Sequence, residues 1–487
     1  MSSAIEGLKP HDLWRSFADL SAIPRESKHE GAAGDFVIAT AKRLGLEHRR
    51  DATGNQVVRK PASRGHERAP SVCLQGHLDM VCVARPGTSH DFARDPIRLV
   101  RNGDSVGADG TTLGADNGIA VAMNLAVMAD PALEHGPLEL LFTVDEETGL
   151  TGARTIDPDL LRSRILINLD SEEEGVLTVG CSGGRDTTGA WTLQWDAAPA
   201  GASALEVRVT GLKGGHSGTE IHQGRGNAIK MMVRILTRLA ALGGRVARLD
   251  GGSKRNAIPA EAQAVVLVPK ARLEDARAAV AEMGDLLRAE IGTVEPGLDV
   301  VATPVKSRPG RVLKRALQRR ILQALTGIPH GVIKMSADIP GLVETSTNAA
   351  VLTTRRDTLT LATSQRSSVA SEIWEAIGTV SAILELGGAE VSGREPYPGW
   401  KPNLDSRILA IAKQTWRERT GKEIGIRAVH AGLECGILGE RFPGMDMVSL
   451  GPNIHDAHSP DERVEIASVE TTWDYLLAIL AAVARGA

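Results

Sequence analysis

Aromatic residues and cysteines are scarce in this chain of 487 residues, and neither sign of charge dominates. Phe, Trp and Tyr together make up 3% of the residues, within an apolar fraction of 42%. The four cysteines form no CxxC pair, which argues against a disulfide framework and against a thiolate metal site. A formal charge of −4 without a dense Lys/Arg cluster argues against nucleic-acid binding.

Long hydrophobic runs are also missing. No apolar stretch approaches the roughly 18 residues of a membrane span, and the polar residues 1–14 lack the apolar core of a signal peptide. We therefore expect a cytoplasmic protein with no membrane association. The chain is long enough for two large cores.

The spacing of apolar residues predicts two kinds of domain. Short apolar runs at 71–74, 138–144 and 165–169 are typical of buried parallel strands, and 118–128 of a buried helix. From about residue 187, alternating strands and amphipathic helices indicate an α+β domain, built of two related halves. The prediction is an α/β domain formed by 1–186 and 397–487, interrupted by an inserted domain over 187–396.

Acidic residues and histidines follow the predicted buried strands. A strand-end aspartate alone is usually a helix cap or a turn former. However, ligands and catalytic groups gather at the carboxyl ends of α/β strands, and several strands here end in such residues. Histidine with carboxylate but no thiolate suits zinc, manganese or cobalt, particularly in a two-metal site. The candidates are His77 and Asp79 in "LQGHLDMV", Asp116 in "LGADNGIA", Glu146 and Glu147 in "FTVDEETG", Asp170 in "LINLDSEE", and His458 in "NIHDAHSPDERV".

Several segments in a fixed order resemble a known family. They include "GHLDMV", "GTTLGADNGIA", "FTVDEETGLTGA", "INLDSEE", "GLKGGHSG", "RNAIP", "HAGLECG" and "AHSPDERV", and they span nearly the whole chain. The sequence resembles the two-metal exopeptidases that include carnosinases, aminoacylase-1 and glutamate carboxypeptidases. The resemblance implies a zinc-exopeptidase-like α/β catalytic domain with a central mixed sheet, and an inserted domain that acts as lid and dimerisation domain. It also implies hydrolysis of small unblocked peptides, Xaa-His dipeptides among them.

The resemblance implies a role for each candidate ligand. His77, Asp116 and Asp170 would hold one metal ion, most simply zinc, with cobalt or manganese as alternatives. Asp116, Glu147 and His458 would hold the second, so that Asp116 bridges the pair. Glu146 would be the general base and Asp79 would orient His77. We expect Glu146 and Glu147 to lie on an extended segment and point apart. The resemblance also implies a cis peptide bond between Asp116 and Asn117.

Four further residues take their roles from the same resemblance. His216 in "GGHSG" would stabilise the oxyanion from the inserted domain of the other subunit, which implies a homodimer. Asn256 and Arg366 would contact the reaction intermediate and the substrate carboxylate, which a guanidinium fork suits. Glu434 would bind the free amino group of the substrate.

Two other enzymatic readings remain open. "GCSGG" matches the serine-hydrolase elbow around Ser182, but that motif requires a helix after the serine and 185–195 indicates a strand. An N-acyl amino-acid deacylase could use the same metal site. A carboxylate at Glu434 favours a free amine over an acyl chain and so favours the dipeptidase.

Overall fold

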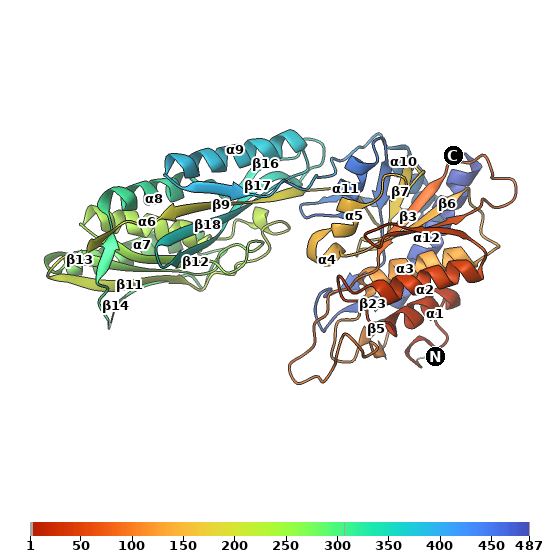
Figure 1. Ribbon diagram of the computed structural model, residues 1–487, viewed down its shortest axis with the longest axis horizontal. Helices are drawn as coiled ribbons and strands as arrows, with labels where there is room; N and C mark the ends of the chain where they lie inside the picture. The colour runs from red at the N-terminus through yellow and green to blue at the C-terminus, as the bar shows by residue number, and fades with distance from the viewer. Residues whose placement is uncertain (1–2, 306, 487) are drawn as a thin grey trace. The chain divides into compact units, whose positions relative to one another are not determined.

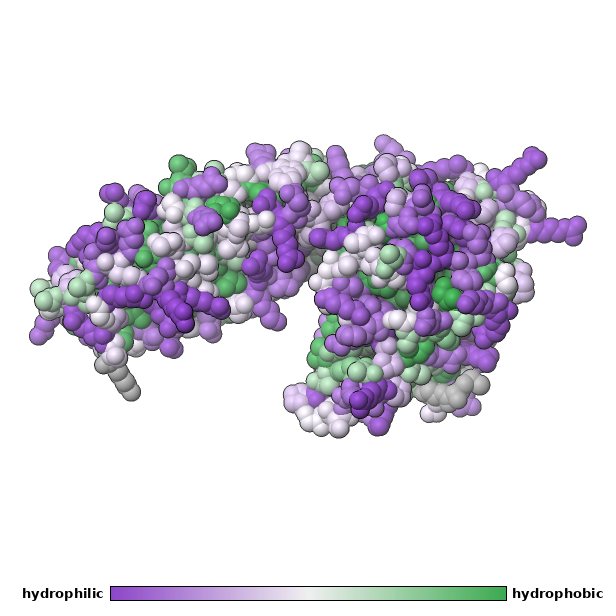
Figure 2. Space-filling view, viewed as in Figure 1, coloured by the Kyte–Doolittle hydropathy of each residue, from purple (hydrophilic) through white to green (hydrophobic). Residues whose placement is uncertain are grey.

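The computed structural model describes residues 3–305 and 307–486, which form two compact units (Figure 1). The first unit comprises 1–181, 400–428 and 433–487, and the second comprises 182–399 and 429–432. The short return of 429–432 to the second unit has no counterpart in the sequence-based layout. On both units hydrophilic side chains cover most of the face seen in Figure 2.

The first unit contains an eight-stranded mixed sheet. Its strand order is β1-β2-β6-β3-β7-β21-β8-β20. Strands β6, β3, β7 and β21 run parallel to one another at its centre. Strand β6 is buried along its whole length, as a strand covered on both faces should be. The strands are β1 Glu47–Arg50, β2 Gln56–Lys60, β3 Val72–His77, β6 Leu138–Thr143, β7 Ile165–Asn168, β8 Val176–Cys181, β20 Gly425–Val429 and β21 Asp446–Ser449.

Helices and a smaller sheet complete this unit. The helices are α1 His11–Ser21, α2 Gly31–Arg43, α3 Ala115–Ala129, α4 Glu146–Gly149, α5 Thr151–Thr155, α10 Arg407–Thr420, α11 Glu434–Arg441 and α12 Ile466–Arg485. A four-stranded sheet has the order β22-β23-β5-β4, with β4 Leu99–Asn102, β5 Ser105–Ala108, β22 Ile454–His455 and β23 Arg463–Glu465. Among the described residues, α12 is the one helix long and apolar enough to cross a membrane, by length and composition only. Half of its apolar window is buried inside the unit, and the core helix of a soluble protein passes the same test.

The second unit contains one large antiparallel sheet made of two similar halves. One half runs β11-α6-β12-β13-α7-β14 along the chain and the other runs β9-α8-β17-β18-α9-β19. The strand order β14-β11-β13-β12-β17-β18-β9-β19 places the two halves edge to edge at β12 and β17, in mirrored order. The prediction of two related halves is therefore confirmed, although the halves form one continuous sheet within a single chain.

One hydrophobic core joins this sheet to its helices. Side chains from α6, α7, α8 and α9 pack with alternate strand residues such as Leu205, Val207 and Val209, so the helices cover one face of the sheet (Figure 1). The strands are β9 Gly183–Thr192, β11 Ala202–Thr210, β12 Arg245–Gly251, β13 Ala262–Pro269, β14 Asp299–Pro304, β17 Val343–Arg355, β18 Thr358–Ser367 and β19 Glu390–Gly393. The helices are α6 Ala228–Ala241, α7 Leu273–Ile291, α8 Arg315–Gly327 and α9 Ala370–Leu386, while β16 Gly331–Met335 pairs with β17 and β10 Trp195–Ala197 with β15 Arg311–Leu313.

One local prediction about the site is wrong. Glu146 and Glu147 do not lie on an extended segment but open the short helix α4. Asp145 just before them has a positive φ of 51°, which turns the chain from β6 into this helix. Successive helical residues project about 100° apart, so the two carboxylates still diverge.

Candidate metal centre

The carboxyl ends of the parallel strands carry the predicted ligands. His77 is the last residue of β3, and its neighbours β6 and β7 end at Thr143 and Asn168. Glu146 and Glu147 follow β6 by one turn, and Asp170 follows β7 by two residues. The parallel register brings these strand ends to the same edge of the sheet, so ligands nearly 100 residues apart in the sequence meet there.

Three of the predicted ligands converge on a first point. Nε2 of His77 lies 3.2 Å from Oδ1 of Asp116 and 3.4 Å from Oδ1 of Asp170. The ligand atoms of all three residues lie within 4.8 Å of one another. His77 is buried, so its ring has a fixed direction toward the two carboxylates.

A second group of ligands uses the other oxygen of Asp116. Nε2 of His458 lies 3.0 Å from Oδ2 of Asp116 and 3.0 Å from Oε1 of Glu147. That glutamate oxygen is buried beside the His458 ring. Asp116 therefore presents one oxygen to each group, which is the arrangement of a bridging carboxylate. The peptide bond between Asp116 and Asn117 is cis, as the resemblance implies.

The spacing of these atoms fits metal coordination. Ligands about 2.0–2.1 Å from a tetrahedral zinc ion stand roughly 3.3 Å from one another. The four separations of 3.0–3.4 Å match that edge. The donor set of imidazole and carboxylate, gathered in two groups that share Asp116, fits two divalent cations.

The charges in the centre are unbalanced without a cation. Burial raises the pKa of Glu146 well above its usual value, with further repulsion from Asp170, Glu434 and Glu147. Burial also raises the pKa of Asp170 to about 6. The cluster thus gathers more carboxylates than its two histidines can neutralise, and bound divalent cations would supply the missing positive charge.

Asp79 connects both groups of ligands. Its Oδ1 lies 3.3 Å from Nδ1 of His77, on the opposite side of the ring from Asp116. Its two carboxylate oxygens also accept hydrogen bonds from the backbone N–H groups of Glu146 and Glu147, at 3.0 and 3.1 Å. Burial opposes the ionised form, but the hydrogen bond and charge of His77, with the hydrogen bonds from Glu146 N–H and Ser27, bring the pKa of Asp79 to about 2. An ionised Asp79 holds His77 in the tautomer that leaves Nε2 free for a metal.

Glu434 lies at the start of α11 and is fully buried. Its Oε2 accepts hydrogen bonds from Gln75 Nε2 and from Thr143 Oγ1, each at 2.6 Å. Its Oε1 has no partner among the described residues. Burial, with repulsion from Asp170 and Asp79, raises the pKa of Glu434 to about 7. A buried carboxylate oxygen without a partner is suited to accept a hydrogen bond from a cationic group.

His216 belongs to the second unit, in the turn that follows β11. Its Nδ1 accepts hydrogen bonds from the backbone N–H groups of Gly218 and Thr219, at 3.3 and 3.1 Å. The ring proton therefore sits on Nε2, which is the donor form that an oxyanion needs. Burial and the nearby Arg366 lower the pKa of His216, which keeps the ring neutral.

Arg366 and Asn256 lie in the same unit as His216. Arg366 is paired across the sheet with Ser346, and its buried Nε has no partner among the described residues. The backbone carbonyl of Asn256 accepts a hydrogen bond from the N–H of Ser217 at 2.8 Å, while its side chain is exposed. His216, Asn256 and Arg366 all belong to the second unit.

Comparison with known proteins assigns the chain to a peptidase family. The model of peptidase family M20/M25/M40 matches residues 73–482. The chain belongs to this peptidase family. It is 40% identical over 479 residues to the cytosol non-specific dipeptidase of Escherichia coli strain K12, covering 98% of this chain and 99% of that protein.

Solved structures agree with this family assignment. An aminoacylhistidine dipeptidase from Vibrio alginolyticus has a TM-score of 0.92 and 42% sequence identity, covering 99% of this chain and 98% of that one. Human carnosine dipeptidase 1 shares the fold with a TM-score of 0.53 at 13% identity, covering 97% and 96% of the two chains.

The structure around Ser182 contradicts the serine-hydrolase hypothesis. Ser182 lies between β8, which ends at Cys181, and β9, which begins at Gly183. A strand rather than a helix follows the serine, so the exposed turn of a nucleophile elbow does not form. Ser182 is also buried.

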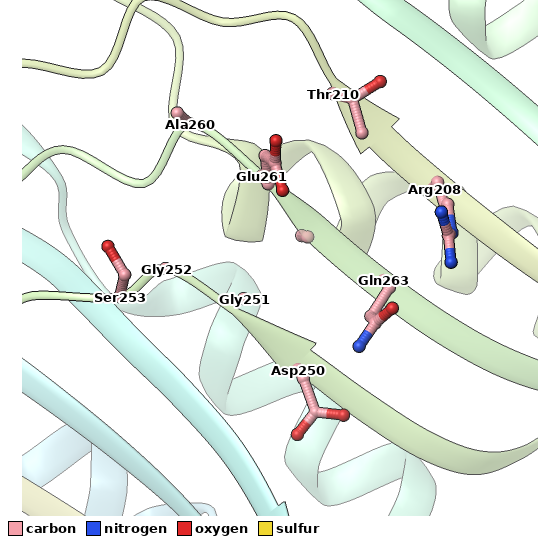
Figure 3. A pocket seen from close by; sticks show the side chains of 10 residues that line it. Arg208, Thr210, Asp250, Gly251, Gly252, Ser253, Ala260, Glu261 and Gln263 are labelled. Atoms are coloured by element: carbon pink, nitrogen blue, oxygen red, sulfur yellow. The ribbon is translucent and has the colours of Figure 1, made fainter.

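A hollow of about 510 Å³ in the second unit contains none of the predicted site residues (Figure 3). Arg208, Asp250 and Gln263 project into it from β11, β12 and β13. Arg208 alternates along β11 with the core residues Val207 and Val209, so the hollow lies on the sheet face opposite the helices.

Sequence reasoning missed two buried charged residues next to the metal centre, Arg25 and Glu462. Glu462 lies within the quoted segment "AHSPDERV", four residues after His458, and could have been noticed there. Arg25 lies in "IPRESKHE", far from any candidate ligand in the sequence, and nothing in the pattern marked it.

Proposed function

We propose that the protein is a two-metal dipeptidase that hydrolyses unblocked dipeptides, Xaa-His peptides among them. This proposal rests on the position of the Asp116 carboxylate between the two groups of ligands, with Oδ1 facing His77 and Oδ2 facing His458. The named relatives add the reaction, since the E. coli protein is a non-specific dipeptidase and the Vibrio protein an aminoacylhistidine dipeptidase.

The mechanism assigns a task to each side chain. Two divalent ions, when bound, would polarise the peptide carbonyl and acidify the attacking water. Glu146 accepts the proton of that water and transfers it to the amide nitrogen as the peptide bond breaks. Asp79 orients His77. Nε2–H of His216 donates to the oxyanion of the tetrahedral intermediate, and Asn256 contacts the same intermediate.

Substrate length would be limited by recognition of both ends. Glu434 binds the free α-amino group through its unpartnered Oε1, and Arg366 binds the substrate carboxylate. The role of Arg366 in binding the substrate carboxylate is proposed from the family resemblance. With one charged group at each end of the substrate, dipeptides fit and longer peptides or acylated amino acids do not.

The direct test is a panel of substrates with defined metals. Ala-His, β-Ala-His and Ala-Ala should be cleaved, and activity should disappear with a chelator and return with zinc, cobalt or manganese. We propose zinc as the native ion, so zinc should be present after purification without added metal. Faster cleavage of N-acetyl amino acids than of free dipeptides would instead identify a deacylase on the same site.

We further propose that the protein is a cytoplasmic homodimer formed through the inserted domain. Strands β14 and β19 end the order of its large sheet among the described residues, and an edge strand can pair with a second copy. The word "cytosol" in the name of the E. coli relative supports the location. Light scattering on purified protein should give twice the mass of the chain, and a monomer at assay concentration would refute the dimer.

Mixed dimers then show how His216 is shared. The resemblance implies that His216 completes the active site of the neighbouring subunit. Subunit exchange between the inactive His216→Ala and Glu146→Gln proteins should therefore restore part of the activity. Mixing His216→Ala with Arg366→Ala shows which site Arg366 serves: no recovery means that one second unit supplies both residues to the same site, and recovery means that Arg366 acts in its own subunit. Continued inactivity of the first mixture, despite proven subunit exchange, would show that His216 acts in its own subunit.

A further inference from the structure

Glu462 is a buried glutamate that binds the backbone of residues 113–116, where the chain enters α3. Its Oε2 accepts hydrogen bonds from the N–H groups of Leu113 at 2.8 Å and Gly114 at 2.9 Å. Its Oε1 accepts from Ala115 at 2.7 Å and from Asp116 at 3.3 Å. Four successive N–H groups therefore point at one carboxylate, and the last of them belongs to the bridging residue Asp116.

The loop is shaped for this approach. Gly114 has a positive φ of 70°, which directs the successive N–H groups inward. A Cβ atom at Gly114 would lie 2.5 Å from Nη2 of Arg25, so a larger residue would displace the guanidinium. Glycine is required here both for the backbone conformation and for space.

Arg25 holds the same loop from its carbonyl side. Its Nη2 donates to the carbonyl of Gly114 at 2.5 Å. Its Nη1 donates to the carbonyls of Leu78 at 3.0 Å and Asp79 at 3.1 Å, in the turn that follows His77. Arg25 therefore joins the loop that carries Asp116 to the turn after His77, the other ligand whose Nε2 faces Oδ1 of Asp116.

Glu462 makes the corresponding link for the second metal. It lies four residues after His458, between β22 and β23, and the two residues share one short segment. Its hydrogen bonds connect this segment to the loop of Asp116. Asp116 and His458 both face the second metal position, together with Glu147. Glu462 thus links the backbone segments that carry these two ligands.

We propose that Glu462 is a positioning residue for the bridging carboxylate of Asp116, with its main effect on the second metal. This inference rests on the proposed function, because it takes Asp116 and His458 to be ligands. A carboxylate has two acceptor oxygens for the four N–H groups, whereas a glutamine has one oxygen and would turn an NH2 group toward N–H donors. Loss of an outer partner of a metal ligand typically costs about 10–100-fold in metal affinity.

The experiment is a two-step zinc titration of metal-free Glu462→Gln against a competing chromophoric chelator. The second ion should bind about 10–100-fold more weakly than in the wild type, and the first ion should change less. With zinc in moderate excess, kcat should fall while KM for Ala-His stays near the wild-type value. Glu462→Asp keeps the charge and both oxygens on a shorter side chain, so it should recover part of the affinity and supplies the same measurement should Glu462→Gln not fold.

Glu139 is the matched control for a buried glutamate. It accepts hydrogen bonds from the N–H groups of Arg162 and Ser163, both at 2.8 Å, and from Arg59 Nε at 3.0 Å. It lies near the start of β6, whereas the candidate ligands follow the other end of that strand. Glu139→Gln should lower the unfolding temperature of the metal-free protein without changing either zinc affinity.

Two outcomes separate this inference from the proposed function. Wild-type zinc affinity in Glu462→Gln, with an altered unfolding temperature alone, would overturn the positioning role and leave Glu462 as a stabilising residue. Asp116→Ala serves as the reference and should lose both zinc ions. Retention of both ions in Asp116→Ala would refute the proposed ligand set itself, whatever Glu462→Gln shows.

Discussion

Replacing Glu434 with Gln tests whether the site selects a free amine. Glutamine has nearly the same shape, and its amide oxygen can still accept the hydrogen bonds from Gln75 and Thr143. Its NH2 group would then occupy the position of the unpartnered Oε1 and face the substrate amine. The variant thus removes the proposed ion pair while leaving the packing around α11 largely unchanged.

The size of the effect follows from the burial of this carboxylate. Glu434 is 0% exposed, so a substrate ammonium bound to it would form a desolvated ion pair. Breaking a buried pair costs about 3–5 kcal/mol, and the retained hydrogen bonds favour the lower part of that range. Since about 1.4 kcal/mol corresponds to a factor of ten, kcat/KM for Ala-His should fall roughly 10²–10³-fold.

Propionyl-His is the matched substrate, because it is Ala-His without the amino group. Its cleavage involves no ion pair to Glu434, so its kcat/KM should change by about tenfold or less. The assay compares both substrates on wild type and Glu434→Gln at equal metal occupancy. An equal fall on both substrates would show that Glu434 supports the site without reading the amine, and no fall on either would remove it from the site.

Four further variants test single residues of the two units. Glu146→Gln should keep both metals yet lose activity by about 10²–10⁴-fold or more, because it removes the general base; loss of metal would make Glu146 a ligand. His458→Ala should lose the second metal and nearly all activity, and His77→Ala should lose the first; unchanged metal content and turnover would refute both assignments. In the second unit, burial and the nearby Lys230 lower the pKa of His330 to about 4. The unfolded state then binds a proton at higher pH than the folded state, so stability from the neutral ring is present above pH 6.5 and is lost on acidification toward pH 4, by up to about 1.4 kcal/mol per pH unit. His330→Gln should flatten the pH dependence of unfolding of the metal-free protein over this window, and an unchanged slope would contradict the burial argument.

The sequence was most informative where a buried strand is followed directly by residues that can bind metal. The buried strands β3, β6 and β7 lie within a few residues of the predicted ranges, because each contains a short continuous apolar run. The seven residues predicted around the metals also gather at one edge of a sheet. His77 and Asp170 meet because their strands are parallel neighbours, which the motif at each strand end already suggested.

Other features depend on contacts that no local pattern records. The short strands β20 and β23 pair with β8 and β5, which are distant in the sequence, and they have too few residues to show a period. The helix at Glu146 begins because Asp145 adopts a positive φ, while the two adjacent glutamates looked equally compatible with an extended chain. In the sequence, Arg25 and Glu462 look like ordinary charged surface residues. The folded structure shows that both are buried because they form hydrogen bonds with the backbone around Gly114.

Anomalous diffraction from zinc-loaded crystals would show whether Asp116 bridges a pair of metal ions. Two anomalous peaks about 3.5–4 Å apart are expected, one between His77, Asp116 and Asp170 and the other between Asp116, Glu147 and His458. A single peak at full activity, or two peaks that Asp116 does not bridge, would contradict this bridging role.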